Sequence, residues 1–509
     1  MEGAGSGWVV DGTVSVNNNP LRAAGSRRPT LIAEGFSVIV TLRGRLPAWA
    51  AWGQASWFAL LVLVWSGLLL SWSLDPDYTA GELLDHLQAW RESGVLYPPL
   101  GSELPVRVLN YPPLVLLLAR ILTEFGAPAL LAGRLVNALG LLAVVAGVAW
   151  WTRGRGARGA ALAGTVGLMG ASFPVLYGAG QFHVELWAAA GTVWGFGLLF
   201  RANSWKGAAL GGLVLALGCF AKQTQVVPSM LALIWIWVHR RPFAPAALAA
   251  YAATGALGAS AITAAWGVEA WLHMVLYTVG MYSVPNLGQQ ALSHLAPWSI
   301  LLAFTAHTAW LRGRQAWSDP ALWYWGGALI WSLSASRIGS GYPYFLDVHI
   351  ATAICVGPRI FRTPPVRSGA WGWLLAIQIV GANLGAAGAL TANAMRLAHT
   401  EAELPALCAR LSGEPRLIAE EAGLTRACGL PTLIHPFITT SLAAQGRWNP
   451  APFEQALRDG DYPIAVLPFD PRGKVTGAHA QRWTKGELAA FRDAPVVELM
   501  PTGRWAARW

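Results

Sequence analysis

The chain has 509 residues, of which 54% are hydrophobic and only 12% are charged, and its mean hydropathy is +0.43. Soluble domains carry roughly 25% charged residues, so this composition argues against a large soluble enzyme. The net charge of +10 does not indicate a nucleic-acid partner. Arg and Lys fall mainly in short gaps between apolar stretches, as in cytoplasmic loops, and do not interleave with aromatic side chains along one face.

Residues 1–52 form a Gly-, Asn- and Arg-rich arm that we expect to lie in the cytoplasm. The first apolar stretch, residues 53–73, has about the 20 residues that a bilayer core requires. Arginines precede this stretch, whereas Asp75 and Asp77 follow it. Because basic residues are retained on the cytoplasmic side, the chain is predicted to start inside and to cross outward.

Residues 74–128 are predicted to form a long first outer loop. Within the loop, Leu83, Leu84, Leu87 and Trp90 repeat at helical spacing with polar residues between them. This pattern predicts an amphipathic helix over residues 79–92 that lies flat on the outer leaflet. A second apolar piece, at 114–122, is too short to span and is placed in the same interface.

Apolar stretches of spanning length continue along the chain. They lie at about 130–151, 158–178, 183–201, 206–221, 223–239, 244–267, 293–311, 320–336, 343–361 and 369–392. Alternate gaps hold the basic residues Arg153, Arg155, Arg158, Arg201, Lys206, Arg240, Arg241, Arg312, Arg314, Arg359, Arg362 and Arg367. The pattern predicts an α-helical polytopic membrane protein with about eleven transmembrane helices over residues 53–392.

The C-terminal part, residues 393–509, is polar enough to form a small α/β domain, which the span count places outside the cytoplasm. The expected strands are residues 416–419, 464–467 and 496–499. The expected helices are residues 453–457 and 485–492. An extracytoplasmic location permits a Cys408–Cys428 disulfide, and two free thiols are the equal alternative. Cys219 and Cys355 lie in apolar stretches, and the absence of a C-x-x-C spacing argues against zinc.

Ionisable groups at membrane depth are costly, so each one is a candidate functional residue. Those at outer span ends or in the first outer loop are Asp75, Asp77, Glu82, Asp85, His183, Glu185, Lys222, Arg337 and Asp347. Acids follow the first span, and bases lie at the ends of later spans. Carboxylates on one side and cations on the other suit a reaction whose leaving group is an anion.

Several short segments, taken in their order along the chain, resemble those of a known protein family. They are Asp75-Pro-Asp-Tyr, Glu92-Ser-Gly-Val-Leu-Tyr97, Asn110-Tyr-Pro-Pro-Leu114, Phe125-Gly126, Gly133-Arg134-Leu135, Ala221-Lys-Gln-Thr224, Arg337-Ile-Gly-Ser340 and Tyr342-Pro-Tyr-Phe345. Together they resemble the GT-C membrane glycosyltransferases, most of all the bacterial branch related to protein mannosyltransferases and aminoarabinose transferases. The resemblance spreads thinly over residues 53–392. The chain departs from the common pattern in having Pro76 between its two acids.

The resemblance implies a polyprenyl-phosphate sugar donor, used on the outer face of the plasma (inner) membrane, and an acidic catalytic base in the first outer loop. We expect Asp77 to be this base, with Asp75 in reserve, because a carboxylate can take the acceptor proton. Lys222 and Arg337 are expected to bind the donor phosphate. The expected substrate-binding residues are Tyr78, Tyr111, His183, Glu185, Tyr342 and Tyr344. No metal site and no cofactor are predicted, and assistance by a divalent cation is left open.

Other readings of the same residues remain. Asp75 and Asp77 can simply cap a helix, and Lys222 can be a snorkelling interface residue. The competing functions are a transporter or flippase of lipid-linked or small polar substrates, and a non-catalytic scaffold. A transporter often shows paired halves with interrupted helices, which the sequence lacks. The expected partners are the lipid-linked donor, a glycan, lipid or protein acceptor, and the membrane, with no nucleic acid.

Overall fold

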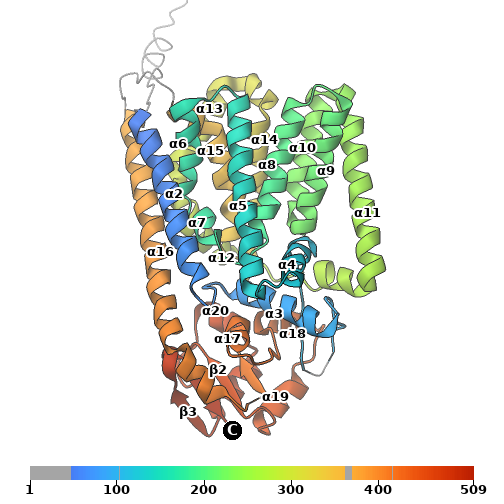
Figure 1. The fold of residues 1–509 in the computed structure, drawn as a ribbon, viewed down its shortest axis with the longest axis vertical. Coiled ribbons are helices and arrows are strands. Elements are labelled where there is room, and N and C mark those ends of the chain that lie inside the picture. The colour runs from blue at the N-terminus through green and yellow to red at the C-terminus, as the bar shows by residue number, and fades with distance from the viewer. Residues whose placement is uncertain (1–47, 102–103, 362–369, 415) are drawn as a thin grey trace, which may run out of the picture. The chain divides into compact units, whose positions relative to one another are not determined.

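The computed structural model describes residues 48–101, 104–361, 370–414 and 416–509. Most of the predicted cytoplasmic arm lies outside the described residues, and so do Arg362 and Arg367. The described part forms a bundle of helices followed by a small α/β domain (Figure 1), which is the predicted fold class.

Every predicted spanning stretch contains helix. The bundle helices are α2 (Ala48–Leu70), α5 (Ala129–Gly154), α6 (Gly159–Gly167), α7 (Phe173–Gly178), α8 (Glu185–Arg201), α9 (Trp205–Ala221), α10 (Val226–His239), α11 (Ala244–Trp271), α13 (Ser299–Arg312), α14 (Pro320–Ser332), α15 (Leu346–Ile360) and α16 (Ala370–Leu411). Among the described residues, four helical stretches are long and apolar enough to cross a bilayer, at Ala48–Leu70, Ala129–Gly154, Arg241–Leu276 and Trp371–Leu411. The other bundle helices are shorter, so the count of eleven spans stays a prediction.

Small residues let the central helices α8 and α9 approach closely. A Cβ atom on Gly191 of α8 would lie 2.5 Å from the Cα atom of Gly218 in α9. Such contacts between small residues are a common way to pack helices in membranes. The close packing matters for the candidate site, because α8 begins at Glu185 and α9 ends immediately before Lys222.

The predicted amphipathic helix is α3 (Tyr78–Ser93), but it does not lie on a lipid surface. Its apolar residues Leu83 and Leu87 are buried in a core shared with α4 (Leu114–Glu124), α5 and α8. Its polar residues Asp85 and His86 are buried as well, and the helix packs against α17 (Ala422–Ala427) of the C-terminal domain. The predicted placement on the outer leaflet is therefore wrong, because protein covers both faces of the helix.

Helix α16 continues from the bundle into the C-terminal domain, so the predicted boundary at residues 392/393 falls inside a helix. The domain has a four-stranded sheet in the order β1 (Leu417–Ala419), β2 (Ile464–Leu467), β4 (Trp505–Arg508), β3 (Val496–Leu499). Strand β1 is parallel to β2, and β4 is antiparallel to both of its neighbours. Three strands coincide with the predicted ones, whereas the Ala-containing strand β4 was not predicted.

The helices of the C-terminal domain are α17, α18 (Pro436–Ala444), α19 (Ala451–Arg458), α20 (Gly477–Arg482) and α21 (Lys485–Asp493). The two predicted helices lie within α19 and α21. Cys408 and Cys428 form a disulfide that joins α16 to the end of α17, which decides between the two alternatives left by the sequence. Cys219 and Cys355 are free.

Candidate active site

A cavity of about 340 Å³ lies where the bundle meets the C-terminal domain, and we call it the junction cavity. The predicted site residues that line it are Asp77, Tyr78, Tyr111, His183, Glu185, Lys222, Arg337, Tyr342 and Tyr344. Asp75, the remaining predicted residue, does not line it. The structure thus brings together residues from the segment between α2 and α5 and from the ends of several bundle helices, where the sequence analysis placed its candidate residues.

Helix termini supply most of the polar groups of the cavity. Asp77 is the N-cap of α3, Glu185 opens α8, and Lys222 follows α9. Arg337 follows a short 3-10 helix after α14, and Tyr342 opens the 3-10 turn before α15. The backbone N–H and C=O groups at helix ends have no partners within the helix. Because several helix ends meet here, the cavity is polar although it lies next to an apolar bundle.

A chain of polar contacts crosses the junction cavity. His183 Nε2 lies 3.3 Å from Asp77 Oδ1, and His183 Nδ1 lies 3.1 Å from Glu185 Oε2. Lys222 Nζ donates to Glu185 Oε1 at 3.0 Å and lies 5.2 Å from the centre of the Tyr344 ring. The hydroxyl of Tyr342 is 3.3 Å from His183 Nε2. This relay connects a carboxylate at one side of the cavity with an ammonium at the other.

The electrostatics of the relay keep Asp77 ionised. Burial alone would raise the pKa of Asp77, but the charge and hydrogen bond of His183 and the Thr79 backbone N–H, which donates at 2.8 Å, lower it below its ordinary value. Among the described residues, both contacts are made to Oδ1. The second carboxylate oxygen is therefore left to meet a ligand.

Asp75 has a different environment although it is only two residues away. Its carboxylate is 1% exposed, pairs with Arg134 at 2.8 Å and accepts the backbone N–H of Phe182 at 3.1 Å. Arg134 also donates to the carbonyl oxygens of Trp72 and Leu74 at 2.7 and 2.8 Å. Asp75 therefore holds the segment after α2 against α5, and it lies outside the cavity.

Two further residues line the cavity: Glu82, an ionisable candidate to which the sequence assigned no role, and Arg482, which the sequence did not indicate. Glu82 lies one helical turn after Tyr78, and its buried Oε1 has no hydrogen-bond partner among the described residues. Burial raises the pKa of Glu82, against the opposing effects of His435 and Arg482. The helical spacing between Tyr78 and Glu82 is the sequence signal that indicates a shared site for the two side chains.

Arg482 reaches the cavity from α20 of the C-terminal domain. Its guanidinium lies 4.1 Å from the centre of the Tyr78 ring and 2.5 Å from Glu420 Oε1. No spacing in the sequence connects Arg482 to the first outer loop, because only the docking of the domain places it there. The domain thus forms one wall of the cavity through Arg482, Gln481 and Phe437.

Arg337 occupies a tightly packed loop. A Cβ atom on Gly280 would lie 2.5 Å from Arg337 Nε, so a larger residue at position 280 would displace the Arg337 side chain. Asn286 Nδ2 donates to the carbonyl oxygen of Arg337 at 2.9 Å and fixes the backbone. The Nε of Arg337, which packs against Gly280, is buried and has no hydrogen-bond partner among the described residues.

The other ionisable candidates do not line the cavity. Asp347 accepts from Gln225 at 2.9 Å and from Tyr324 at 2.5 Å inside the bundle. Within the described residues, no group of three His, Cys, Asp or Glu side chains is arranged to hold a metal ion.

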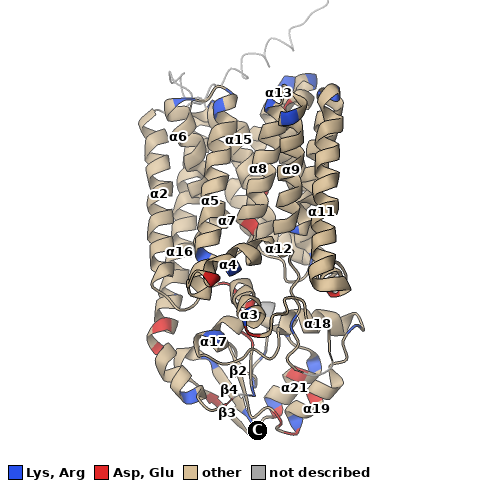
Figure 2. Ribbon diagram, turned by 45° about the vertical axis from the view of Figure 1, so that its right-hand side comes forward, with Lys and Arg blue, Asp and Glu red and all other residues tan. Residues whose placement is uncertain are grey.

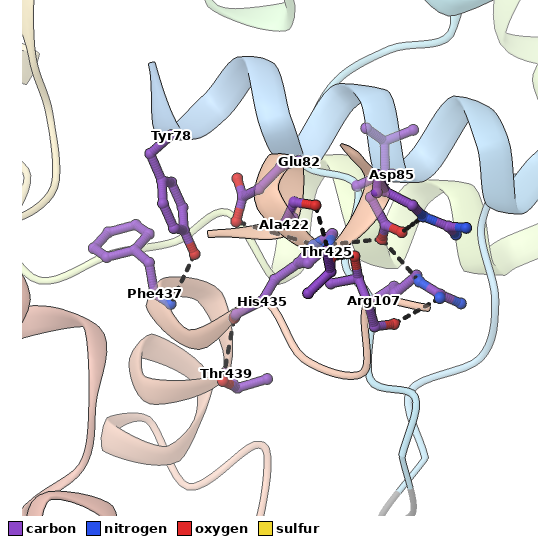
Figure 3. A network of polar contacts seen from close by, with 12 residues as sticks. Tyr78, Glu82, Asp85, Arg107, Ala422, Thr425, His435, Phe437 and Thr439 are labelled. Carbon is purple, nitrogen blue, oxygen red and sulfur yellow. Dashed lines mark hydrogen bonds and ion pairs between the residues drawn. The ribbon is translucent and has the colours of Figure 1, made fainter. Parts of the chain in front are cut away.

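Asp85 is the centre of a network that docks the C-terminal domain on α3 (Figure 3). Its carboxylate accepts from Arg107 Nε at 2.8 Å, Arg426 Nε at 2.6 Å and His435 Nε2 at 2.9 Å. Burial opposes ionisation, but these three partners hold the pKa of Asp85 well below its ordinary value. A backbone hydrogen bond from Val106 N to Leu433 O, at 2.8 Å, adds to the same contact.

No protein-family model matches the chain, and no curated protein matches it in sequence. Solved structures do share its fold. ArnT from Cupriavidus metallidurans in the apo state superposes with a TM-score of 0.59 at 13% identity, over 93% of this chain and 98% of that one. The same protein bound to undecaprenyl phosphate gives a TM-score of 0.57 at 14% identity, over 89% and 97% of the two chains.

The oligosaccharyltransferase of Archaeoglobus fulgidus in its apo form is also similar, with a TM-score of 0.53 at 11% identity over 85% of this chain and 72% of that one. At these identities the similarity concerns the fold. The chain is a polytopic α-helical membrane protein with the fold of the GT-C glycosyltransferases, and the predicted resemblance is confirmed at that level.

Proposed function

We propose that the protein is a glycosyltransferase that moves a sugar from a polyprenyl-phosphate donor to a cell-envelope acceptor on the outer face of the membrane. The observation that carries the proposal is the composition of the junction cavity, in which Asp77 and Glu82 lie together with Lys222 and Arg337. The shared fold supports it, since ArnT has been solved with undecaprenyl phosphate.

In this mechanism an acceptor hydroxyl attacks the anomeric carbon of the donor sugar. Asp77 takes the hydroxyl proton as general base, while the bond between the anomeric carbon and the phosphate oxygen breaks. The transition state resembles an oxocarbenium ion. Polyprenyl phosphate leaves with the bonding electron pair, and N–H donors of Lys222 and Arg337 stabilise the negative charge on its oxygens.

The remaining cavity residues are proposed to hold the substrates. His183 and Glu185 connect the base to Lys222, so they keep the two charges at a fixed separation. Tyr78, Tyr111, Tyr342 and Tyr344 present aromatic faces and hydroxyl groups on which a sugar ring can stack and to which it can bond. These side chains are proposed to orient the sugar and the acceptor hydroxyl between base and phosphate.

We propose that the protein lies in the plasma (inner) membrane with its N-terminus in the cytoplasm and its C-terminal domain outside. Lys and Arg gather at the end of the bundle opposite the C-terminal domain (Figure 2), which supports this orientation. The Cys408–Cys428 disulfide supports it too, since disulfides persist in oxidising compartments. A reporter fused after Trp509 is expected to act outside the cytoplasm, and a cytoplasmic signal would contradict the orientation.

The function is tested with purified protein, labelled polyprenyl-phosphate sugars and an envelope fraction as acceptor. We expect the label to move to the acceptor and polyprenyl phosphate to be released, and we expect Asp77→Asn to prevent both. Glu124→Gln is a matched control, because it removes an exposed carboxylate from α4, away from the cavity. For a flippase, the intact donor would instead cross a vesicle membrane without cleavage, and that outcome would refute the proposal.

A further inference from the structure

A second group of charged side chains lies at the end of the bundle opposite the junction cavity. Three arginines surround a pocket of about 350 Å³: Arg155 follows α5, Arg312 ends α13 and Arg359 lies in the last turn of α15. Figure 2 shows Lys and Arg gathered at this end near α13. The mechanism proposed for the junction cavity uses none of these residues.

Positive charge exceeds negative charge in this basic pocket. Asp319 is the one carboxylate among the described residues that line it, so three guanidinium groups and one carboxylate leave a formal charge of +2. Asp319 Oδ2 accepts from Arg155 at 2.9 Å and also pairs with Arg312, while Oδ1 pairs with Arg155 and caps α14 through Ala321 N at 3.1 Å. The acceptor capacity of Asp319 is therefore fully used.

Arg359 is left without a carboxylate partner among the described residues. Within the described part of the chain, its guanidinium donates one hydrogen bond, from Nη1 to the carbonyl oxygen of Cys355 at 3.1 Å. A guanidinium carries five N–H donors in a planar fork, so most of its donors, and several of those on Arg155 and Arg312, are available to a ligand. This fork matches the oxygens of a phosphate group, which it can bind through two hydrogen bonds.

The walls of the basic pocket and its surroundings indicate where such a phosphate comes from. Phe200 and Pro358 contribute apolar wall. Trp310 and Trp317, at the same end of the bundle, are 73% and 68% exposed, and exposed tryptophans are typical of the membrane–water interface. We infer that the pocket lies at the depth of lipid headgroups, and that its apolar wall can contact the acyl chains of a bound lipid.

We propose that the basic pocket binds the phosphate of an anionic phospholipid from the leaflet on its side of the membrane. Basic pockets between transmembrane helices are suited to such headgroups. A zwitterionic lipid fits less well, because its cationic group finds no free carboxylate among the described wall residues. The proposal is independent of the glycosyltransferase function.

The test uses delipidated full-length protein in neutral detergent. Phosphatidylglycerol, phosphatidylcholine and inorganic phosphate are added separately, and bound lipid is counted by native mass spectrometry while thermal unfolding is followed. We expect phosphatidylglycerol to stay bound and to raise the Tm more than the other two. Arg359→Gln should weaken its binding by about tenfold or more, as expected for loss of a charge-assisted hydrogen bond. Arg359→Lys keeps the charge but not the planar fork, so its affinity for phosphatidylglycerol should lie between that of the native protein and that of Arg359→Gln.

Arg153→Gln is the matched control, since it removes the same charge at the same end from an exposed position outside the pocket. Equal phosphatidylglycerol binding by Arg359→Gln and Arg153→Gln would overturn the proposal. Equal stabilisation by inorganic phosphate would also overturn it, because the site would then serve a free anion. Neither readout depends on sugar transfer, so failure here is distinguishable from failure of the proposed enzyme activity.

Discussion

His183 Nε2 lies 3.3 Å from Asp77 Oδ1, and this contact joins the start of α3 to the residues just before α8. The other ring nitrogen of His183 meets Glu185, which in turn holds Lys222. The proposed base and one of the proposed phosphate-binding groups are therefore linked by side-chain contacts. Any change in the middle of this relay should affect the charge state of Asp77 as well as the position of Lys222.

Asp77→Asn should abolish sugar transfer and leave the fold intact. Removal of a general base typically costs about a hundred- to ten-thousand-fold in rate, and Asn retains the ability of Asp77 to cap α3. Turnover of the labelled donor measures the first effect, and thermal unfolding in detergent measures the second. Near-normal turnover of this variant would remove Asp77 from the mechanism.

Asp75→Asn should have a different effect, which makes it a useful comparison. The variant leaves Arg134 buried without its carboxylate, and breaking a buried ion pair costs on the order of 3–5 kcal/mol of stability. We expect a lowered Tm, with activity lost only in proportion to the loss of folded protein. If Asp75→Asn kept its Tm and lost transfer while Asp77→Asn remained active, the two roles would be exchanged.

The pH profile distinguishes Asp77 from Glu82 as the base. A base must be deprotonated, so activity falls as the pH drops through its pKa. The pKa of Asp77 lies below its ordinary value of 3.8, and the rate should therefore show no acid limb between about pH 5 and about pH 8. Burial raises the pKa of Glu82 above its ordinary value of 4.5, so base catalysis by Glu82 would move an acid limb toward weakly acidic pH.

His183→Gln extends the same test. The substitution removes the main group that lowers the pKa of Asp77 while burial continues to raise it, so the acid limb should move upward in pH. Glu82→Gln is the matched control and should leave the limb where it is. Loss of transfer in Glu82→Gln, together with an unshifted acid limb in His183→Gln, would assign the base to Glu82.

Loss of either proposed phosphate-binding cation should weaken donor binding. Lys222→Gln and Arg337→Gln each remove a charged donor from the junction cavity, and such hydrogen bonds contribute about 1.5–3 kcal/mol. The Kd for undecaprenyl phosphate should thus rise roughly 10- to 100-fold. Lys206→Gln, an exposed lysine outside the cavity, should bind normally. Unchanged donor affinity in both cavity variants would contradict this role.

The helical bundle and most cavity residues were predictable because a bilayer imposes strict rules on sequence. Apolar stretches must be long enough to span, and charges at the ends of these stretches, such as Lys222 and Arg337, must have a use or a partner. These rules apply to each span separately. They therefore indicated the polar residues at the helix ends without any knowledge of how the helices pack.

What the sequence did not reveal depends on contacts between distant segments. The amphipathic pattern of α3 predicted a lipid surface, because nothing in it shows that Arg107 and Arg426 neutralise Asp85 on the polar face. Arg482 enters the cavity only through the docked domain. Asp75 and Asp77 were left nearly equivalent, since only the packing of α5 places Arg134 beside the first of them.

Asp85→Asn should loosen the C-terminal domain from the bundle. The side chain is fully buried and has Arg107, Arg426 and His435 as partners, so the variant leaves buried cations uncompensated at a cost of about 3–5 kcal/mol. We expect a lower Tm and faster proteolysis of the domain. Because α18 and α20 wall the cavity, sugar transfer should weaken as well.

The pH dependence of this effect has a definite sign. The pKa of Asp85 is depressed in the folded protein, so its contribution to stability is complete above the unfolded value near 3.9 and is lost as the pH falls below it. The difference in Tm between the native protein and Asp85→Asn should be constant from about pH 5 to about pH 8 and should shrink toward pH 3. Glu92→Gln, which removes an exposed carboxylate that also pairs with Arg426, is the matched control and should cost less than about 1 kcal/mol. Equal losses in the two variants would show that the buried network does not hold the domain in place.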